Sequence, residues 1–289
     1  MRTRLTLALS AAIVAAPLPA LAWGNEGHEV VALIARSYLA PSVLARVDQL
    51  LAEDGDTLTA QDMASRATWA DKWRAADRST APWHYTDLQL GRPDLAEACG
   101  SRRSCAPDKV TEFASELASR RTPEAERIFA LKMVLHLVGD MHQPLHSATA
   151  AAGGRDDAGG NCERVSVFGL FGPRRTMSLH AYWDDATVEA LGSNPKSIAS
   201  NLREQITAAE VLTWSKGTPA SWTMESYGLA EQVAYRFGGP VRCASTIAPL
   251  DAAYQQRAVQ TASLQLRRAG VRLATVLNRS IGGTLTPSM

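Results

Sequence analysis

The chain has 289 residues, and its 30 Lys and Arg against 29 Asp and Glu give a formal net charge of +1. Proteins that hold nucleic acid through Lys and Arg alone are usually strongly basic, so this near-neutral balance excludes that mode of binding. The length suits one large domain or two small ones. No internal repeat, Pro-rich linker or low-complexity tract divides the chain, and we expect one domain.

The first 22 residues are typical of a secretory signal peptide. Two arginines precede an apolar run from Leu5 to Ala16, and Ala20-Leu21-Ala22 supplies small residues before a cleavage site. The apolar run is shorter than the ~20 residues that span a bilayer, which argues against a membrane anchor. We predict a signal peptide over 1–22, cleavage between Ala22 and Trp23, and a secreted or periplasmic domain over 23–289 without a membrane segment.

Helical signals dominate the rest of the chain, because apolar residues recur at helical spacing between N-cap, Pro and Gly signals. The first four helices are expected over Asn25 to Leu39, Ser42 to Ala52, Thr59 to about Arg74, and about Asp108 to Arg121. The longest helix is expected to begin with Thr122 as N-cap and Pro123 at the first helical position, and to end at about Met141.

The middle of the chain changes character. Ala151 to Gly160 is a predicted loop, and alternating residues after Arg164 predict a strand that Gly169 to Pro173 would join to Arg175 to Leu179 as a hairpin. Helices resume from Leu179, with later ones near 195–209, 220–237 and 248–278. The predicted fold class is mainly α with a short β-hairpin.

Four cysteines would meet an oxidising compartment after export, where an even count favours disulfides. Four cysteines allow three connectivities. Cys99 and Cys105 lie close in a loop rich in Gly, Ser and Arg, so we expect them to pair, which leaves Cys162 with Cys243. The alternative is a cysteine-type zinc site, but the chain has no Cys-x-x-Cys spacing.

Most of the six histidines occur near aspartates at metal-binding spacings. His136 and Asp140 are four residues apart on a predicted helix and project from one face, and His180 and Asp184 repeat that spacing. His146 follows just past the predicted helix end. A single pair is more often an ion pair, but two pairs with His146 between them favour a metal. Imidazole and carboxylate without thiolate suit zinc in a catalytic site.

The predicted new N-terminus is a second anomaly. A terminal Trp23 would offer its amino nitrogen and carbonyl oxygen as a five-membered chelate, with His28 about one turn away. A Trp near a terminus usually serves packing, and this one gains meaning only beside the other ligands. His142 points off the face shared by His136 and Asp140, and we expect a structural role for it.

Six ordered blocks between residues 23 and 184 make the chain resemble the secreted zinc-dependent S1/P1 nuclease family, as a bacterial member. The blocks are Trp23-Gly-x-x-Gly-His28, Trp69-Ala-Asp71, Trp83-His84-Tyr85-x-Asp87, His136-x-x-x-Asp140-x-His142-Gln-Pro-Leu-His146, Gly159-Gly160-Asn161 and Leu179-His180-x-x-Trp183-Asp184. The resemblance implies the single-domain helical fold shared by zinc-dependent phospholipases C and single-strand nucleases.

The resemblance also implies three Zn²⁺ ions as cofactors. One would be held by Asp71, His84, His136 and Asp140, a second by the Trp23 amino nitrogen and carbonyl oxygen, His28 and the bridging Asp140, and the third by His146, His180 and Asp184. Three carboxylates offset only half of the formal +6, so a near-neutral protein would still attract phosphate. The activity implied is extracellular hydrolysis of single-stranded RNA and DNA to 5′-nucleotides through a zinc-activated hydroxide, with 3′-mononucleotides as further substrates and a monomeric enzyme.

Catalytic and base-binding roles follow from the same resemblance. Asp71 would orient the attacking water, and Arg74, where some relatives carry Lys, would hold phosphoryl oxygens with a forked donor. Tyr85 would stack on an unpaired base and Asp87 would accept from its edge. The contacts would be completed by Gly159, Gly160 and Asn161. Alternatively, Tyr85 is a core residue and Asp87 a helix cap.

Two rival functions remain at this point. A zinc-dependent phospholipase C would use the same scaffold, but that family places its first His farther from the Trp and ends its third site with Glu. A zinc-sequestering protein without catalysis is the second rival, and Arg74 and the pocket residues argue against it.

Overall fold

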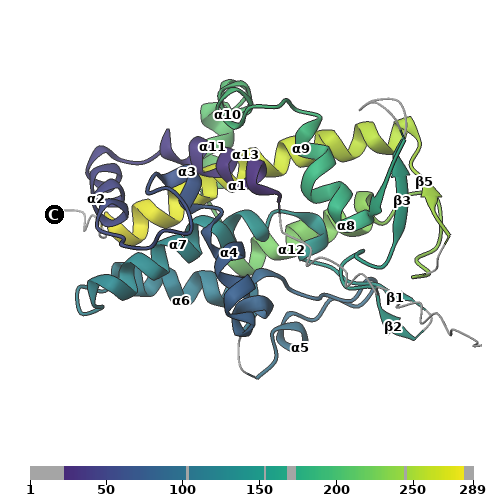
Figure 1. Ribbon diagram of the computed structural model, residues 1–289, viewed down its shortest axis with the longest axis horizontal. Helices are drawn as coiled ribbons and strands as arrows, with labels where there is room; N and C mark the ends of the chain where they lie inside the picture. The colour runs from purple at the N-terminus through teal and green to yellow at the C-terminus, as the bar shows by residue number, and fades with distance from the viewer. Residues whose placement is uncertain (1–22, 102–103, 153, 168–173, 244–245, 283–289) are drawn as a thin grey trace, which may run out of the picture.

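The computed structural model describes residues 23–101, 104–152, 154–167, 174–243 and 246–282. The predicted signal peptide and the predicted hairpin turn over 169–173 lie outside these residues. Helices make up most of the described chain, and the short strands gather toward one end (Figure 1). No described helix has both the length and the apolar composition needed to cross a membrane.

The elements follow one another in a fixed order along the chain. They are α1 (Asn25–Arg36), α2 (Pro41–Ala52), α3 (Met63–Arg66), α4 (Trp69–Ala76), the 3₁₀ helix η1 (Arg78–His84), α5 (Leu95–Cys99), α6 (Ala106–Ala118), α7 (Glu124–Asp140), the 3₁₀ helix η2 (Pro144–His146), β1 (Ala151–Ala152), β2 (Arg155–Asp156), β3 (Arg164–Val167), β4 (Arg175–Ser178), α8 (Leu179–Ala181), the π-helical turn η3 (Tyr182–Ala186), α9 (Thr187–Glu189), α10 (Pro195–Glu204), α11 (Ala208–Trp214), α12 (Pro219–Leu229), the π-helical turn η4 (Ala230–Ala234), β5 (Ala248–Pro249) and α13 (Ala252–Ile281).

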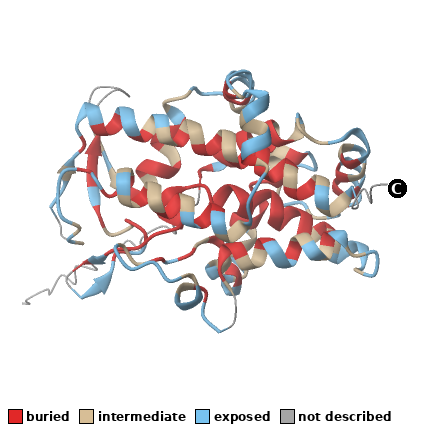
Figure 2. Cartoon of the chain, turned by 180° about the vertical axis from the view of Figure 1, so that it is seen from behind, coloured by how far each residue is buried: buried red, intermediate tan, exposed pale blue. Residues whose placement is uncertain are grey.

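Helix α13 crosses most of the molecule, and α1, α6 and α7 pack against it (Figure 1). Buried residues line the inward faces of these helices, while exposed residues lie outside (Figure 2). Helix α7 is the most enclosed, because every residue from Ala130 to Asp140 is buried. A helix buried on all sides belongs inside a protein core, so its polar side chains need partners there.

Two apolar cores meet just beyond α7. Met141 belongs to the larger core among the helices, and Leu145 belongs to a second core that includes Trp183 and Tyr254. The second core covers one side of a sheet of order β4-β3-β5, in which β3 pairs antiparallel with β4 and parallel with β5. The segment after α7 therefore lies at the junction of the two cores.

The predicted hairpin is confirmed, since Val165 pairs with Met177 across β3 and β4. The single helix predicted from Thr59 to Arg74 is wrong, because α3 and α4 are separate elements with Ala67 and Thr68 between them. Asp62 caps α3 by accepting from the backbone N–H groups of Ala64 and Ser65. The carbonyl and the hydroxyl of Thr59 instead each accept a hydrogen bond from Nη1 of the buried Arg66.

Other predicted boundaries also need correction. Helix α7 begins at Glu124 with Pro123 at its N-cap and no side-chain cap, so the capping role predicted for Thr122 is wrong. The segment 195–209 divides into α10 and α11, and residues 248–249 form β5 before α13 begins. Asp251 caps α13 by accepting from the Tyr254 N–H. The longest helix is α13, with 30 residues against 17 in α7.

Candidate metal centre

The last turn of α7 supports the first cluster of candidate ligands. His136 Nε2 lies 3.2 Å from Asp140 Oδ2, as expected for residues four apart on one helix face. His84, at the end of η1, places its Nδ1 3.0 Å from the same oxygen and 3.1 Å from His136 Nε2. Asp71 of α4 brings its Oδ1 to 3.6 Å from His136 Nε2. Four side chains from three elements thus converge inside the protein.

His28 approaches the other oxygen of Asp140. Its Nε2 lies 3.3 Å from Asp140 Oδ1, and its ring stacks on that of His136 with 3.9 Å between centroids. A Cβ at Gly139 would lie 2.8 Å from His28 Nδ1, so only glycine leaves room for this ring on α7. Asp140 therefore faces two separate groups of ligands, as the predicted bridging role requires.

Trp23 lies beside the same helix end and is fully buried. Its indole N–H donates to the Gly139 carbonyl at 3.0 Å. The following residue, Gly24, donates its backbone N–H to the Asp184 carbonyl, also at 3.0 Å. The indole of Trp23 is therefore bonded to the last turn of α7, and the residue after it is bonded to η3, so this segment joins the two parts of the chain that carry Asp140 and Asp184.

A third cluster joins η2 to α8 and η3. His146 Nε2 and His180 Nε2 face each other at 3.0 Å, and His180 Nε2 lies 3.4 Å from Asp184 Oδ2. Gln143 donates to the other oxygen of Asp184 at 2.6 Å. The chain after α7 thus contributes both a candidate ligand, His146, and a side chain that orients another ligand.

Backbone carbonyls fix which nitrogen of three histidines faces inward. The Nδ1 atoms of His136, His146 and His180 lie 2.7 to 2.8 Å from the carbonyls of Ala67, His84 and Gly159. A carbonyl only accepts, so each Nδ1 must carry the proton and each neutral ring must present a lone pair at Nε2. This arrangement is the usual outer support of a metal-bound imidazole.

Several buried atoms of the clusters make no hydrogen bond among the described residues, although Asp71 Oδ1 lies at ion-pair distance from Arg74 Nη2 (3.2 Å) and Asp140 Oδ1 from His28 Nε2 (3.3 Å). They are both ring nitrogens of His28, Nε2 of His84, Oδ1 of Asp71 and Oδ1 of Asp140. Buried polar atoms are otherwise almost always paired, and facing lone pairs repel unless a cation lies between them. Nitrogen and oxygen donors without thiolate match zinc, so the residues present fit zinc ions.

The protonation of the clusters also suits metal binding. Burial lowers the pKa of His146 to about 3 and of His180 to about 4. Burial likewise lowers the pKa of His28 and of His84 below the usual histidine value. These four imidazoles are therefore neutral near pH 7, which is the form that binds a metal.

His136 behaves differently, because it lies between two carboxylates. Burial opposes its charge, but Asp140 and Asp71 outweigh burial and raise the pKa of His136 to about 9. Burial raises the pKa of Asp184 well above the usual value for a carboxyl group. Without a cation, His136 therefore keeps its proton near pH 7, and metal binding there should release it.

A pocket of about 250 Å³ opens beside the third cluster. It brings together most of the predicted catalytic and base-binding side chains with two of the candidate ligands. The lining residues are Arg74, Tyr85, Asp87, Leu145, His146, Asp156, Ala158, Gly159, Asn161 and His180. Gly160, which the sequence also placed at the base, is buried and does not line the pocket. Asp156, Leu145 and Ala158 were not predicted.

The loop after β2 owes its shape to Asp157, which sequence reasoning missed. This carboxylate is fully buried and accepts from Thr149 Oγ1, the backbone N–H groups of Ala150 and Gly160, and the Tyr235 hydroxyl. Ala158, Gly159 and Gly160 follow with φ angles of 53°, 60° and 82°. Such a left-handed run favours glycine, and it turns the Gly159 carbonyl toward His180. The residues that donate to Asp157 are too far apart in the sequence for a local pattern to reveal its role.

Arg74 lies between the first cluster and the pocket. Its Nη2 is 3.2 Å from Asp71 Oδ1, and its side chain also lines the pocket. Lys72, also on α4, donates instead to the hydroxyl of Thr68, the residue before α4, at 3.0 Å. Arg74 is thus the basic side chain of α4 that reaches the predicted phosphate position.

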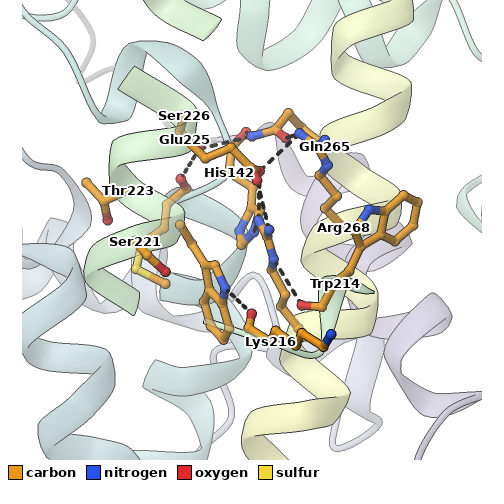
Figure 3. Close-up of polar contacts among 12 residues, drawn as sticks. His142, Trp214, Lys216, Ser221, Thr223, Glu225, Ser226, Gln265 and Arg268 are labelled. Carbon is orange, nitrogen blue, oxygen red and sulfur yellow. Dashed lines mark hydrogen bonds and ion pairs between the residues drawn. The ribbon is translucent and has the colours of Figure 1, made fainter. Parts of the chain in front are cut away.

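His142 stays outside the metal clusters, as its position off the ligand face predicts. Its Nδ1 donates to the Val138 carbonyl at 2.7 Å, and its Nε2 lies 2.9 Å from an Arg272 nitrogen. Figure 3 shows the imidazole among side chains of α12 and α13. Both ring nitrogens are therefore occupied by structural contacts.

Two disulfides are present among the described residues, Cys99–Cys105 and Cys162–Cys243. This is the connectivity favoured by the short Cys99 to Cys105 loop. The second bond follows Asn161 directly and ties the pocket loop to a segment 81 residues away in sequence. A cysteine-type zinc site is wrong for these residues, because each sulfur is already bonded to another.

Comparisons with known proteins agree with this geometry. The family model described as S1/P1 Nuclease matches residues 23–282. The chain is 32% identical over 225 residues to Nuclease S1 of Aspergillus oryzae, which covers 75% of this chain and 72% of that protein. It is 25% identical to Nuclease P1 of Penicillium citrinum over 287 residues, covering 91% and 99%. It is 27% identical to Endonuclease 2 of Arabidopsis thaliana over 287 residues, covering 90% and 91%.

Proposed function

This chain belongs to the S1/P1 nuclease family, and on that premise we propose that it is a zinc-dependent endonuclease that hydrolyses single-stranded RNA and DNA to 5′-nucleotides. The single observation that carries the proposal is the convergence of three buried His/Asp clusters beside a pocket that contains Arg74 and Tyr85. The named relatives are nucleases, which disfavours the phospholipase C alternative. Its bacterial origin stays a prediction.

We propose three zinc sites from the ligand groups. The first would use Asp71, His84, His136 and Asp140, the second the Trp23 terminus, His28 and Asp140, and the third His146, His180 and Asp184. The orphaned buried atoms of Asp140 and His28 support the first two sites. When bound, the ions would lower the pKa of a water molecule and offset the negative charge of the phosphate.

The side chains have separate tasks in the proposed hydrolysis. The water oxygen forms a bond to phosphorus while the bond from phosphorus to the 3′-oxygen breaks, which leaves a 5′-phosphate and a 3′-hydroxyl. Arg74 donates to the phosphoryl oxygens from the pocket wall, where its pairing with Asp71 at 3.2 Å orients the guanidinium. Asp71 accepts from the attacking water and orients it.

Base recognition would occur in the same pocket. Tyr85 is half-buried and offers a ring face for stacking, while Asp87 is exposed to the pocket and accepts from the base edge. Asn161 lines the pocket and donates one amide N–H to the Ala158 carbonyl, which fixes the direction of its amide. A stacked base must be unpaired, which explains a preference for single strands.

The remaining proposals concern processing and substrates. We propose that residues 1–22 are a signal peptide, that cleavage after Ala22 frees the Trp23 amine, and that residues 23–289 form the secreted or periplasmic domain. The support for a ligand role of this terminus is that Trp23 is buried and bonded to Gly139, the residue before Asp140. We further propose that the enzyme is a monomer and that it also releases phosphate from 3′-mononucleotides.

One experiment tests the proposed reaction directly. The mature protein is incubated with a single-stranded oligonucleotide, its matching duplex and a phosphatidylcholine emulsion, and the product ends are identified by mass spectrometry. We expect 5′-phosphate ends from the single strand, little cleavage of the duplex and no lipid product. Products with 3′-phosphate ends would overturn the mechanism, lipid hydrolysis would indicate a phospholipase C, and zinc binding without any product would indicate a zinc-sequestering protein.

A further inference from the structure

The metal centre depends on a segment that leaves its helix. Helix α7 ends at Asp140, and the chain then turns through Met141 to Gln143 before it supplies His146. The last carbonyls of a helix have no partner within it. Pro144 lacks an N–H and cannot continue the helix. The Gln143 carbonyl accepts from the His146 N–H at 3.0 Å, but the buried carbonyls of Met141 and His142 receive no backbone hydrogen bond among the described residues and need side-chain donors.

Two side chains from the C-terminal third of the chain donate to carbonyls of this turn, and the Ser147 hydroxyl adds a longer contact of 3.4 Å to the Met141 carbonyl. The Ser226 hydroxyl of α12 donates to the Met141 carbonyl at 2.6 Å, and Gln265 Nε2 of α13 donates to the His142 carbonyl at 3.0 Å. Gln265 Nε2 also lies 3.0 Å from Ser226 Oγ. Both side chains are fully buried. The Ser226 hydroxyl and one amide N–H of Gln265 thus each bond a carbonyl of this turn, while the other amide N–H of Gln265 donates to Ser226.

The direction of each bond in this network is fixed. Gln265 Oε1 accepts from Arg268 Nη1 at 3.2 Å, so its amide nitrogen must face Ser226 and the His142 carbonyl. Arg272 donates to His142 Nε2 and pairs with both oxygens of Glu225 at 2.9 Å. Figure 3 shows Ser226 and Glu225 on one side of His142, with Gln265 and Arg268 on the other. The network therefore links α12 and α13 to the turn after α7.

We propose that Ser226 and Gln265 are positioning residues for the metal centre. Met141 follows Asp140 directly, and His142 precedes Gln143, the residue that donates to Asp184 at 2.6 Å. The two carbonyls that accept from Ser226 and Gln265 thus lie, in the sequence, between Asp140, which the first two ligand groups share, and Gln143, which orients a ligand of the third group. The inference rests on the proposed zinc sites and gives a role to helices that carry none of the sequence motifs.

The test removes the two hydrogen bonds from Ser226 and Gln265 to the turn, which we call the clamp, without changing a proposed zinc ligand. Ser226→Ala and Gln265→Glu each remove donors to the turn, and Ser226→Thr keeps the hydroxyl as the conservative rescue. Thr223→Val is the matched control, because Thr223 is a fully buried hydroxyl on the same helix whose bond goes to the Pro219 carbonyl of its own helix. Mature protein of each variant is stripped of metal, reloaded with zinc alone and titrated with a chelator.

The quantities measured are the zinc retained per chain and the rise in Tm on reloading. Loss of an outer partner of a metal ligand typically weakens metal binding by 10–100-fold. We therefore expect Ser226→Ala and Gln265→Glu to lose at least one zinc at about tenfold lower chelator concentration, with a smaller rise in Tm. Ser226→Thr should restore the retention, and Thr223→Val should match the unaltered protein in retention even where its metal-free Tm falls.

Unaltered zinc retention in both clamp variants, with metal-free Tm lowered as in Thr223→Val, would make the network purely structural and overturn the inference. Should Ser226→Ala not fold, Gln265→Glu and Ser226→Thr decide the outcome between them. If the unaltered protein bound no zinc, the proposed function itself would fail, which is a different result from variants that match a zinc-binding parent.

Discussion

One added residue before Trp23 should remove one zinc ion and most of the turnover. A free α-amine has a pKa near 7.7–8.0 and loses its proton readily beside a dication, whereas an amide nitrogen donates its lone pair to its carbonyl. Trp23 is fully buried, its indole bonds to the Gly139 carbonyl at 3.0 Å, and Gly24 bonds to the Asp184 carbonyl at 3.0 Å. Trp23 is thus held at the end of α7 that carries Asp140, which limits how far an extended chain could shift to offer another donor.

The expected size of the effect follows from linkage. An ion present at about 100 times its Kd stabilises the folded state by about 2.7 kcal/mol. In a chain of this size, 1 kcal/mol changes Tm by about 2–4 °C, so its loss should lower Tm by roughly 5–11 °C. Protein that begins at Trp23 and protein with one Gly before it are compared by elemental analysis, thermal unfolding and turnover on one single-stranded substrate.

The control separates the amine from the indole. Trp23→Phe keeps a free terminus but loses the bond to Gly139, so it should keep its zinc although its metal-free Tm falls. The ligands of the other two sites lie between Asp71 and Asp184, and these sites should survive the extension. Equal zinc and equal turnover with and without the added Gly would refute the reasoning and make Trp23 a packing residue.

Three further predictions concern ligands, base choice and pH. Asp140→Asn should lower turnover on every substrate by roughly 10³-fold, because Asp140 faces two ligand groups, and residual activity above a tenth would contradict its bridging role. Asp87→Asn should change the ratio of rates on different homopolymers by about tenfold while turnover persists, and a uniform loss would place Asp87 outside base recognition. Burial lowers the pKa of His146 to about 3 and of His180 to about 4, below the usual value of about 6.5, so each contributes stability above pH 6.5 that is lost as the pH falls. Between pH 7.5 and 5 each of these two histidines should contribute a loss of about 2 kcal/mol to the zinc-free protein, so His180→Gln should lose about 2 kcal/mol less over this range than the unaltered protein, measured by urea unfolding.

Local spacing was sufficient to predict the pairs within the metal centre. His136 and Asp140 meet because residues four apart share one face of an α-helix, and His180 and Asp184 meet at the same spacing across the junction of α8 with the π-helical turn η3. Convergence between these pairs was predicted only through the family motifs. The contact of His28 with Asp140 depends on the missing side chain at Gly139, a feature with meaning only once both helices are placed.

Residues that support the centre were missed for a related reason. Asp157 gathers donors from Thr149 and Tyr235, which are separated by 86 positions in the chain, so no local pattern marks it. The start of α13 was different, because Asp251 is a cap signal that the sequence already contained. Helical periodicity across 248–278 concealed it, and Pro249 fits the short strand β5 instead.

The charge of the chain and its proposed substrate can now be reconciled. Among the described residues that line the pocket, Arg74 is the only Lys or Arg. With three zinc ions bound, the carboxylates of Asp71, Asp140 and Asp184 would offset three of six positive charges and leave +3 inside one cleft. Attraction would then be strongest for the few phosphates next to the metal centre, because the whole chain has a formal net charge of only +1. A flexible single strand can bend a phosphate into such a cleft, whereas a duplex needs a broad basic surface, so the strand preference follows from where the charge lies as well as from base stacking.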